Sequence, residues 1–392
     1  MATLEGLVDT EVLLALNEIR EPVIIPSIDG GEPSKGEIIH RWGPLLLGYR
    51  EVSRIAVHRS SKPSYDTKPL ITRRQFKELL FRHASAAPVE PIVGETERRL
   101  DRSLDLYLEG KRVDKKNCVF CPDNIYTKTP SPRITHQDLR TSSGNQVISV
   151  PNISPFMQEH LVTAFAGHIG KLSDLTYQDM DSYMLSVFQI ARDYENRGAV
   201  GMHSFFNLGQ EAGGSVIHLH THNGLVNDTK IFYLENERAS IFQGLNGTGY
   251  FMTTKLMDAL KDKGLTIFEN DHVFIYAAWA PRYPHQVEVF FRNPRDATRG
   301  GNVLEFDPED LRVASRSLLG VYHALGDLGV TDLNTALHQS PFKDGPAGYR
   351  MQAEFTPRNL ATHGGAETTK KFYVSPTLPE ETAKFMRGHF NR

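Results

Sequence analysis

The stretch from Gly213 to His222 constrains this chain more than any other part of it. It reads GGSVIHLHTH, so His218, His220 and His222 alternate with other residues. In a β-strand, side chains at positions i, i+2 and i+4 share one face, which would place the three imidazoles roughly 7 Å apart on the same side. Imidazole is a metal ligand, a nucleophile and an acid or base near neutral pH. The pattern therefore predicts a strand whose side chains take part in catalysis or metal binding.

Composition narrows the class of protein. The chain has 392 residues, of which 40% are hydrophobic and 23% charged, as in an ordinary globular protein with a large core. A net charge of −3 does not favour nucleic-acid binding. No apolar run approaches the ~20 residues of a membrane helix, and no signal peptide is visible at the start. With only two cysteines a disulfide framework is excluded, so we expect a cytoplasmic protein with no nucleic-acid or membrane partner.

Periodicity and turn residues predict an α+β protein with a second α+β unit after about residue 228. Helices are expected at residues 4–20, 73–84, 95–111, 177–198, 253–263, 308–328 and 379–387. Strands are expected at residues 146–150, 160–165, 203–207, 216–226, 272–280, 286–291 and 349–356.

Cys118 and Cys121 form a C-x-x-C pair, a spacing that suits tetrahedral Zn²⁺. The chain has no other cysteine, so histidines must complete any such site. The candidates are His136, His160, His168 and His218. A redox role would need a helix starting at the first cysteine, and the sequence PDN at residues 122–124 interrupts it. Two buried thiols without a role are the remaining alternative.

The three alternating histidines allow three interpretations. They could be structural residues with satisfied hydrogen bonds. They could all bind one catalytic metal that keeps an open position for water. Alternatively, one binds a structural metal and the next is a nucleophile that attacks phosphorus. The preceding residues favour phosphate chemistry, because the backbone N–H groups of Gly213 and Gly214 can cradle an anion and Ser215 adds a hydroxyl donor.

The sequence resembles the galactose-1-phosphate uridylyltransferases, a branch of the histidine-triad (HIT) superfamily. Residues 207–220, NLGQEAGGSVIHLH, resemble the family's active-site stretch, in which Asn-x-Gly and Gly-x-Ser precede His-Pro-His-x-Gln. Further segments follow in the family's order: CVFCP at 118–122, VPNISP at 150–155, HLVTAFAGH at 160–168, HQSPF at 338–342, EFTPR at 354–358, GGAE at 364–367 and YVSP at 373–376. The likeness covers roughly residues 116 to 392.

The resemblance implies a fold and a set of roles. The fold would be two HIT-like halves, each an antiparallel sheet with packed helices, at residues 116–230 and 231–392, after a divergent region at 1–115. Cys118, Cys121, His168 and His218 would hold a structural Zn²⁺. His220 would form a covalent nucleotidyl adduct, and members are commonly homodimers. Substrate contacts would come from Asn152 to the nucleoside, from Asn207 and Ser215 to the α-phosphate, and from Gly213, Gly214 and His338.

The chain departs from the family at several positions. His222 replaces the Gln that follows the nucleophile, and histidine-triad hydrolases carry His there, where it aids leaving-group departure or water attack. Leu219 replaces a Pro. QAE at 352–354 stands where some members have a His-x-His for a second metal, so we expect that site to be absent. Residues 1 to about 110 lack the family's usual opening.

These features predict a nucleotidyltransferase that moves a nucleoside monophosphate from a nucleotide sugar, or a related nucleotide, to a phosphorylated acceptor through His220. The closest alternative is a nucleotide hydrolase or phosphorylase with the same adduct, in which His222 takes part. A second alternative is a metal hydrolase with His218, His220 and His222 on one ion. A nucleotide-binding protein without activity is the last.

Overall fold

A computed structural model describes residues 14–25, 34–42, 52–55, 118–152, 155–165, 168–169, 171–209, 211–214, 216, 218–228, 233–245, 248–360, 365–370 and 372–390. Contacts divide the chain into a main body, residues 1–60 and 119–392, and a segment of residues 61–118. Of that segment only Cys118, where it joins the body, is described. The helices expected at residues 73–84 and 95–111 lie outside the described residues.

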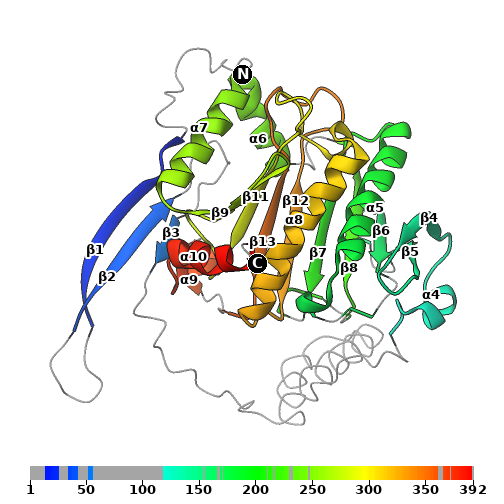
Figure 1. The fold of residues 1–392 in the computed structure, drawn as a ribbon, viewed down its shortest axis with the longest axis horizontal. Helices are drawn as coiled ribbons and strands as arrows, with labels where there is room; N and C mark the ends of the chain where they lie inside the picture. Colours follow the sequence, from blue (N-terminus) through cyan, green and yellow to red (C-terminus); the bar gives the residue numbers. More distant parts are fainter. Residues whose placement is uncertain are drawn as a thin grey trace, which may run out of the picture. The chain divides into compact units, whose positions relative to one another are not determined.

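The main body is built on a ten-stranded sheet whose order repeats itself (Figure 1). From one edge to the centre the order is β4-β5-β6-β8-β7, and from the other edge it is β9-β10-β11-β13-β12. The two series meet where β7 pairs with β12, antiparallel like the other pairs of this sheet. The α+β class is confirmed. The division into residues 116–230 and 231–392, called the first and second half below, stays a prediction.

The strands of the first series are β4 (Ile134–Arg140), β5 (Gln146–Pro151), β6 (Gln158–Ala164), β7 (Gly201–Leu208) and β8 (His220–Val226). Those of the second are β9 (Thr266–Glu269), β10 (Val273–Ala277), β11 (Val287–Phe291), β12 (Leu333–His338) and β13 (Gln352–Pro357). The helices are α4 (Pro122–Lys128), α5 (Tyr177–Asn196), α6 (Tyr233–Gly244), α7 (Gly249–Asp262), α8 (Pro308–Asp327), α9 (Gly365–Lys370) and α10 (Pro379–Phe390), with short 3₁₀ turns at Leu172–Asp174 and Val303–Glu305.

Each half places one long helix between its third and fourth strands in chain order: α5 after β6 and α8 after β11. Both helices have strong N-terminal caps. Thr176 and Asp179 form a reciprocal capping box on α5, and Asp307 caps α8 ahead of Pro308. Both helices have 20 residues and contribute their apolar stripes to one continuous core. The second half therefore repeats the helix position as well as the strand order of the first.

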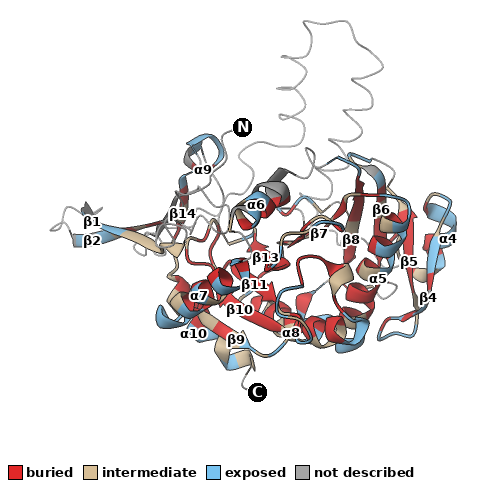
Figure 2. Cartoon of the chain, turned by 90° about the horizontal axis from the view of Figure 1, so that it is seen from above, coloured by how far each residue is buried: buried red, intermediate tan, exposed pale blue. Residues whose placement is uncertain are grey.

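The two faces of the sheet are covered by different helices (Figure 2). That view shows α5 and α8 on one side and α6 on the other. Residues such as Met202, Phe206 and Leu333 belong to the core with α5 and α8. Their neighbours along the strands point to the opposite side, which we call the α6 face. His222 and Asn207 lie on the α6 face.

A smaller sheet joins the two ends of the described chain. Its order is β1 (Asn17–Ile25), β2 (Ser34–Trp42), β3 (Val52–Ile55) and β14 (Phe372–Ser375), with β3 and β14 parallel. Buried Arg41 fixes it to the body, because its guanidinium donates to Glu380 at 2.7 Å and lies 4.0 Å above the Trp279 ring.

Several local expectations change. The helix expected at 4–20 is wrong for its last residues, since 17–20 form β1 and pair with β2. The strand expected at 216–226 begins only at His220, because Leu219 is turned to bond with Ile169. The expectation that PDN at residues 122–124 interrupts a helix is wrong, because α4 begins at Pro122 with Cys121 as its N-cap residue. β4, β9, β12 and α6 were not predicted. No helix among the described residues is both long and apolar enough to span a membrane.

Candidate active site and metal centre

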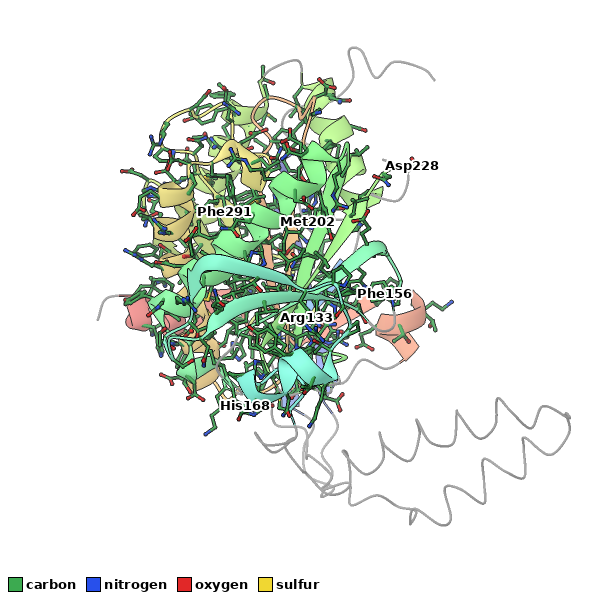
Figure 3. All side chains as sticks on the ribbon, turned by 90° about the vertical axis from the view of Figure 1, so that its right-hand side faces the viewer. Arg133, Phe156, His168, Met202, Asp228 and Phe291 are labelled. Atoms are coloured by element: carbon green, nitrogen blue, oxygen red, sulfur yellow. The ribbon has the colours of Figure 1, made fainter. Side chains whose placement is uncertain are left out.

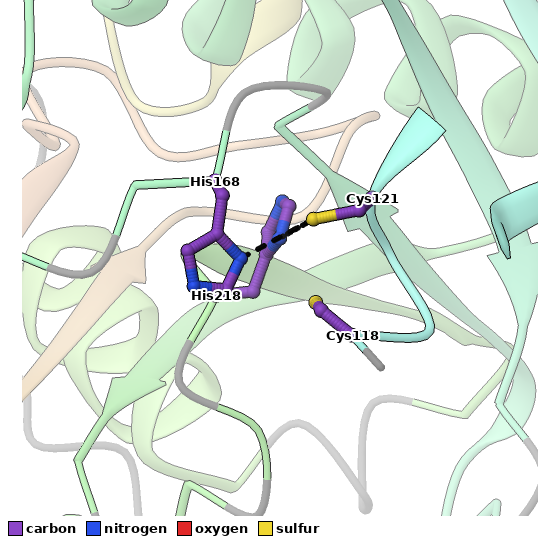
Figure 4. A group of neighbouring side chains, drawn as sticks. All are labelled: Cys118, Cys121, His168 and His218. Atoms are coloured by element: carbon purple, nitrogen blue, oxygen red, sulfur yellow. Dashed lines mark hydrogen bonds between the residues drawn. The ribbon is translucent and has the colours of Figure 1, made fainter. Parts of the chain in front are cut away.

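Four side chains from separate parts of the first half converge on one point (Figure 4). One ligand atom from each of Cys118, Cys121, His168 and His218 lies within 4.8 Å of the others. Cys121 Sγ is 3.3 Å from Nδ1 of His168 and 3.8 Å from Nδ1 of His218. Sulfur and nitrogen bound to one tetrahedral Zn²⁺ would be ~3.6 Å apart. The donor set therefore fits zinc in both chemistry and spacing.

His218 is oriented for this role by the backbone. Its Nε2 donates a hydrogen bond to the carbonyl oxygen of Phe165, so the neutral ring presents the lone pair of Nδ1 to the cysteines. Burial lowers the pKa of His218 to about 4, which keeps the ring unprotonated at neutral pH. Metal binding requires this neutral form.

His220 begins β8 and is not among the four residues of the cysteine–histidine cluster. Its Nδ1 lies 2.6 Å from the carbonyl oxygen of His218, which can only accept, so Nδ1 carries the proton. The neutral ring then has an unprotonated Nε2, the state that a nucleophile needs. Burial lowers the pKa of His220, and the Phe120 ring packs 5.0 Å from it. Backbone geometry and burial together hold His220 in one tautomer.

His222 belongs to a second polar group, with His160 on the neighbouring strand. Nε2 of His160 is 2.9 Å from Nδ1 of His222, and the amide nitrogen of Asn152 is 3.2 Å from Nδ1 of His160. Phe205 stacks on His222 at 5.0 Å. Burial, together with the neighbouring imidazoles of His220 and His160, lowers the pKa of His222 to about 3. If the Asn152 amide donates to Nδ1 of His160, then His160 donates to His222, whose Nε2 keeps its proton.

An exposed aromatic side chain lies beside these groups. Phe156, labelled in Figure 3 with the buried Met202 of the core, keeps 71% of its surface exposed. Its ring is 4.7 Å from that of His160, edge to face. The loop after β5 thus brings an apolar surface and the Asn152 amide to the same imidazole.

Gly209, Gly213 and Gly214 belong to the loop before β8, called the glycine loop below. Residues of the second half hold this loop in place. A Cβ on Gly209 would lie 2.2 Å from the carboxylate of Asp332, and one on Gly214 would lie 2.7 Å from the carbonyl of Asn207. The same Asp332 carboxylate accepts from the backbone of Glu211 at 2.9 Å. Glycine is required here because backbone and carboxylate approach too closely for any side chain.

Asn207, at the end of β7, connects this loop to the second half. The side-chain nitrogen of Asn334 on β12 donates to Asn207 Oδ1 at 2.7 Å and to the carbonyl of Ala212 at 2.8 Å. The β7–β8 register, which ends at Phe206 and Thr221, runs on toward Asn207 and His220. Asn207, Gly213 and Gly214 therefore lie where the sequence motif predicts an anion cradle. Ser215 lies outside the described residues.

The other histidines named from sequence lie apart from the metal cluster. His136 bonds to Gln189 of α5 and to Ser149, on the α5 side of the sheet, and His160 pairs with His222. His338 lies in the second half, 3.1 Å from Glu235 and 3.5 Å from Glu354. Its role in substrate binding stays a prediction.

Asp332 and Asn334 were missed by sequence reasoning. They lie more than a hundred residues after the glycine loop that they hold, Asp332 just before β12 and Asn334 within it, in a stretch without a motif. The pairing of β7 with β12 is what brings them there.

Comparison with known proteins finds a matching domain and similar folds. Residues 138–223 match the HIT domain. No curated protein sequence matches the chain. Among solved structures, a GALT-like protein from Arabidopsis thaliana is similar at 19% identity and TM-score 0.55, over 71% of this chain and 93% of that one. An ADP-glucose phosphorylase from Arabidopsis thaliana with bound ADP-glucose gives 19% identity and TM-score 0.55, over 71% and 92%.

A uridylyltransferase structure is similar at 20% identity and TM-score 0.51, over 70% of this chain and 90% of that one. Identities this low show a shared fold. Residues 138–223 thus match the HIT domain model, and the chain shares its fold with the GALT-like protein and the uridylyltransferase.

Proposed function

We propose that this protein is a nucleotidyltransferase that moves a nucleoside monophosphate from a nucleotide sugar or related nucleotide to a phosphorylated acceptor. The carrier is a covalent adduct on His220. The observation that supports this most directly is the 2.6 Å contact of His220 Nδ1 with the carbonyl oxygen of His218, which leaves Nε2 as a fixed nucleophile. The named activities of the structural neighbours, uridylyl transfer and ADP-glucose phosphorolysis, agree with a nucleotide-handling enzyme.

The reaction has two steps of the same kind. Nε2 of His220 attacks the α-phosphorus, a P–N bond forms, and the bond to the bridging oxygen breaks with its electron pair leaving on that oxygen. An acceptor oxygen then attacks phosphorus and breaks the P–N bond, which restores His220. We assign the α-phosphate to the backbone of Gly213 and Gly214 with Asn207 and Ser215. Asn152 would contact the nucleoside.

Hydrolysis or phosphorolysis through the same adduct is the second candidate. The bond between His160 and His222 favours it, because a His222 that keeps its Nε2 proton can donate to a leaving oxygen. The third candidate, one catalytic ion on three histidines, has less support. Among the described residues His218 groups with Cys118, Cys121 and His168, while His220 bonds to the backbone instead.

We assign a structural Zn²⁺ to Cys118, Cys121, His168 and His218. A bound zinc would supply rigidity to the knuckle and to the backbone of His218. The carbonyl of that residue accepts the hydrogen bond that sets the His220 tautomer. The metal's contribution to activity would then act through the position of this carbonyl.

Intact-mass measurement tests the proposal. The protein is incubated with nucleotide sugars and dinucleotides that carry each base, quenched and weighed. A mass gain of one nucleoside monophosphate, absent in His220→Asn, is the expected result. No adduct from any donor, combined with an activity lost on chelation and restored by metal, would favour the metal hydrolase. If the adduct forms, hexose phosphates, inorganic phosphate and water added separately distinguish transfer, phosphorolysis and hydrolysis.

His222 is tested in the same assay. A His222→Gln variant that gains transfer to hexose phosphates at the expense of hydrolysis would assign acceptor choice to this position. We also propose a homodimer and a cytoplasmic location, which light scattering of the purified protein and fractionation of source cells would check.

A further inference from the structure

The second half contributes an arginine to the edge of the glycine loop. Arg358 follows β13 directly, and its backbone N–H donates to the carbonyl of Asp332 at 2.8 Å. Its Nη1 donates to Oδ1 of Asn334 at 2.8 Å. The amide nitrogen of Asn334 in turn donates to Asn207. One side-chain bridge therefore separates the Arg358 guanidinium from the proposed phosphate cradle.

Among the residues that the structure describes, no carboxylate balances the charge of this guanidinium. No carboxylate of the described residues forms an ion pair with Arg358, and its buried Nε has no hydrogen-bond partner. The group instead lies 4.6 Å above the ring of Tyr283. By contrast, Arg282 pairs with Glu354 and Arg316 with Asp181. A partly buried guanidinium without a carboxylate is well suited to a phosphate, which its planar fork can bind through two N–H groups.

The sheet register places Arg358 on the side of the nucleophile. Asn207 pairs with Asn334, and Asn334 pairs with Thr356, so these side chains share the α6 face. Arg358 is two residues beyond Thr356, and its contact with Asn334 shows that it reaches back across the strands. Neighbouring strands are about 4.8 Å apart, so the guanidinium lies within about two strand spacings of the His220 strand.

We propose that Arg358 binds the phosphate group next to the transferred one. This group leaves in the first step and attacks in the second, so its chemistry is that of a phosphate monoester or inorganic phosphate dianion. As the bridging oxygen takes the electron pair of the breaking P–O bond, the leaving phosphate gains charge, and the guanidinium stabilises it. The inference rests on the proposed function of His220. It adds that Arg358, from the second half, favours a phosphate over water as the acceptor that attacks the adduct.

Two kinds of donor separate this role from a structural one. With a nucleotide sugar as donor, the leaving group is the sugar phosphate, a phosphate monoester. With a nucleoside 5′-phosphorofluoridate the leaving group is fluoride, so Arg358 has no second phosphate to bind. We expect Arg358→Gln to lower kcat/KM for adduct formation from the nucleotide sugar about 10- to 100-fold. The rate from the phosphorofluoridate should stay within about twofold of wild type. Arg358→Lys should recover part of the loss, because it restores the charge without the fork.

The control is Arg312→Gln, which removes one positive charge from the exposed surface of α8. It should leave both donors unchanged. An equal fall of Arg358→Gln on both donors, or no fall on either, overturns the inference while the adduct itself upholds the proposed function. If wild type forms no adduct from either donor, the proposed function itself fails.

The second step identifies the source of the phosphate. Adduct made from the phosphorofluoridate is mixed with inorganic phosphate, with glucose 1-phosphate or with buffer alone, and its decay is followed by mass. Arg358→Gln should slow discharge by whichever phosphate wild type accepts and leave discharge by water unchanged. Wild-type adduct that decays no faster with either phosphate than with water would overturn the inference.

Discussion

The two halves share a strand order and a helix position but differ in what they bury on the α6 face. The first half buries neutral imidazoles whose protons are fixed by backbone carbonyls and by one another, as in His220 and His222. At the matching central strand of the second half stand Gln352 and Glu354. Burial lowers imidazole pKa values in the first half, whereas Arg282 and His338 hold the pKa of buried Glu354 well below its usual range.

The imidazoles of the two halves therefore suit different roles. A neutral imidazole with a free lone pair can attack phosphorus, but the carboxylates of Glu235 and Glu354 raise the pKa of His338 and so favour its cation over that neutral form. The second half instead holds the loop of the first through Asp332 and Asn334. The first half therefore holds the imidazoles to which we assign the chemistry. The second half holds buried ion pairs and the side chains that bond to the glycine loop.

The largest difference between the halves should be metal dependence. Cys121→Ser removes one ligand of the cluster in the first half, and no equivalent cluster occurs among the described residues of the second. Zinc binding contributes on the order of 10 kcal/mol in small structural sites, so we expect loss of bound metal and a fall in Tm of more than 10 °C. Metal analysis and calorimetry measure this, with chelated wild type as the comparison. A variant that melts like metal-bound wild type would contradict the assignment.

The second half should depend on its buried charges. Glu354→Gln leaves Arg282 and His338 without their shared carboxylate, which should cost about 3–5 kcal/mol in the free energy of unfolding. Urea denaturation measures the change. Glu309→Gln, which breaks the exposed pair with Arg312, is the matched control and should cost less than about 1 kcal/mol. Similar losses in the two variants would show that the buried network is not a unit.

The halves should respond to pH in opposite directions. Unfolded histidine titrates near pH 6.5, but folded His222 does so only near a pKa of about 3. Below pH 6.5 the unfolded state binds more protons, so the contribution of His222 to stability is complete above pH 6.5 and falls by about 2 kcal/mol at pH 5.

His338 behaves in the opposite way. Its two carboxylate partners raise its pKa, so its contribution is complete below pH 6.5 and is lost as pH rises through the folded pKa. Denaturation across pH should show a flatter acid limb in His222→Gln and a flatter alkaline limb in His338→Gln. Unchanged limbs in both variants would refute the assigned protonation states.

The smallest expected effects are at the matched helix caps. Thr176→Ala removes the cap of α5 and Asp307→Ala that of α8, and each should cost about 1 kcal/mol. If the halves share one cooperative core, both variants should shift the same urea transition. Separate transitions would show that the halves unfold independently.

Local pattern predicted much of this molecule. The amphipathic stripe and final glycine of residues 177–198 predicted α5, and a long helix was also predicted at 308–328, where α8 lies. β9 has only four residues, and β12 has six with Asn334 and Thr335 side by side, so neither carried a hydrophobic period long enough to detect. Cys118 and Cys121 were predicted as metal ligands. Spacing alone left His136, His160, His168 and His218 as equal candidates to complete the site, and the family resemblance selected His168 and His218.

The sequence by itself determined the chemistry available: two cysteines at knuckle spacing, three alternating histidines and glycines where a backbone must approach a carboxylate. The family resemblance already implied that the histidines divide, but only the tertiary structure shows by what means, because β8 begins at His220 and a turn carries His218 to the cysteines. It also decided that Asn334 and Arg358 reach the glycine loop, through the pairing of β7 with β12. Local spacing is written in neighbouring residues, whereas such contacts depend on which strands pair, and pairing is set by the burial of the whole sheet.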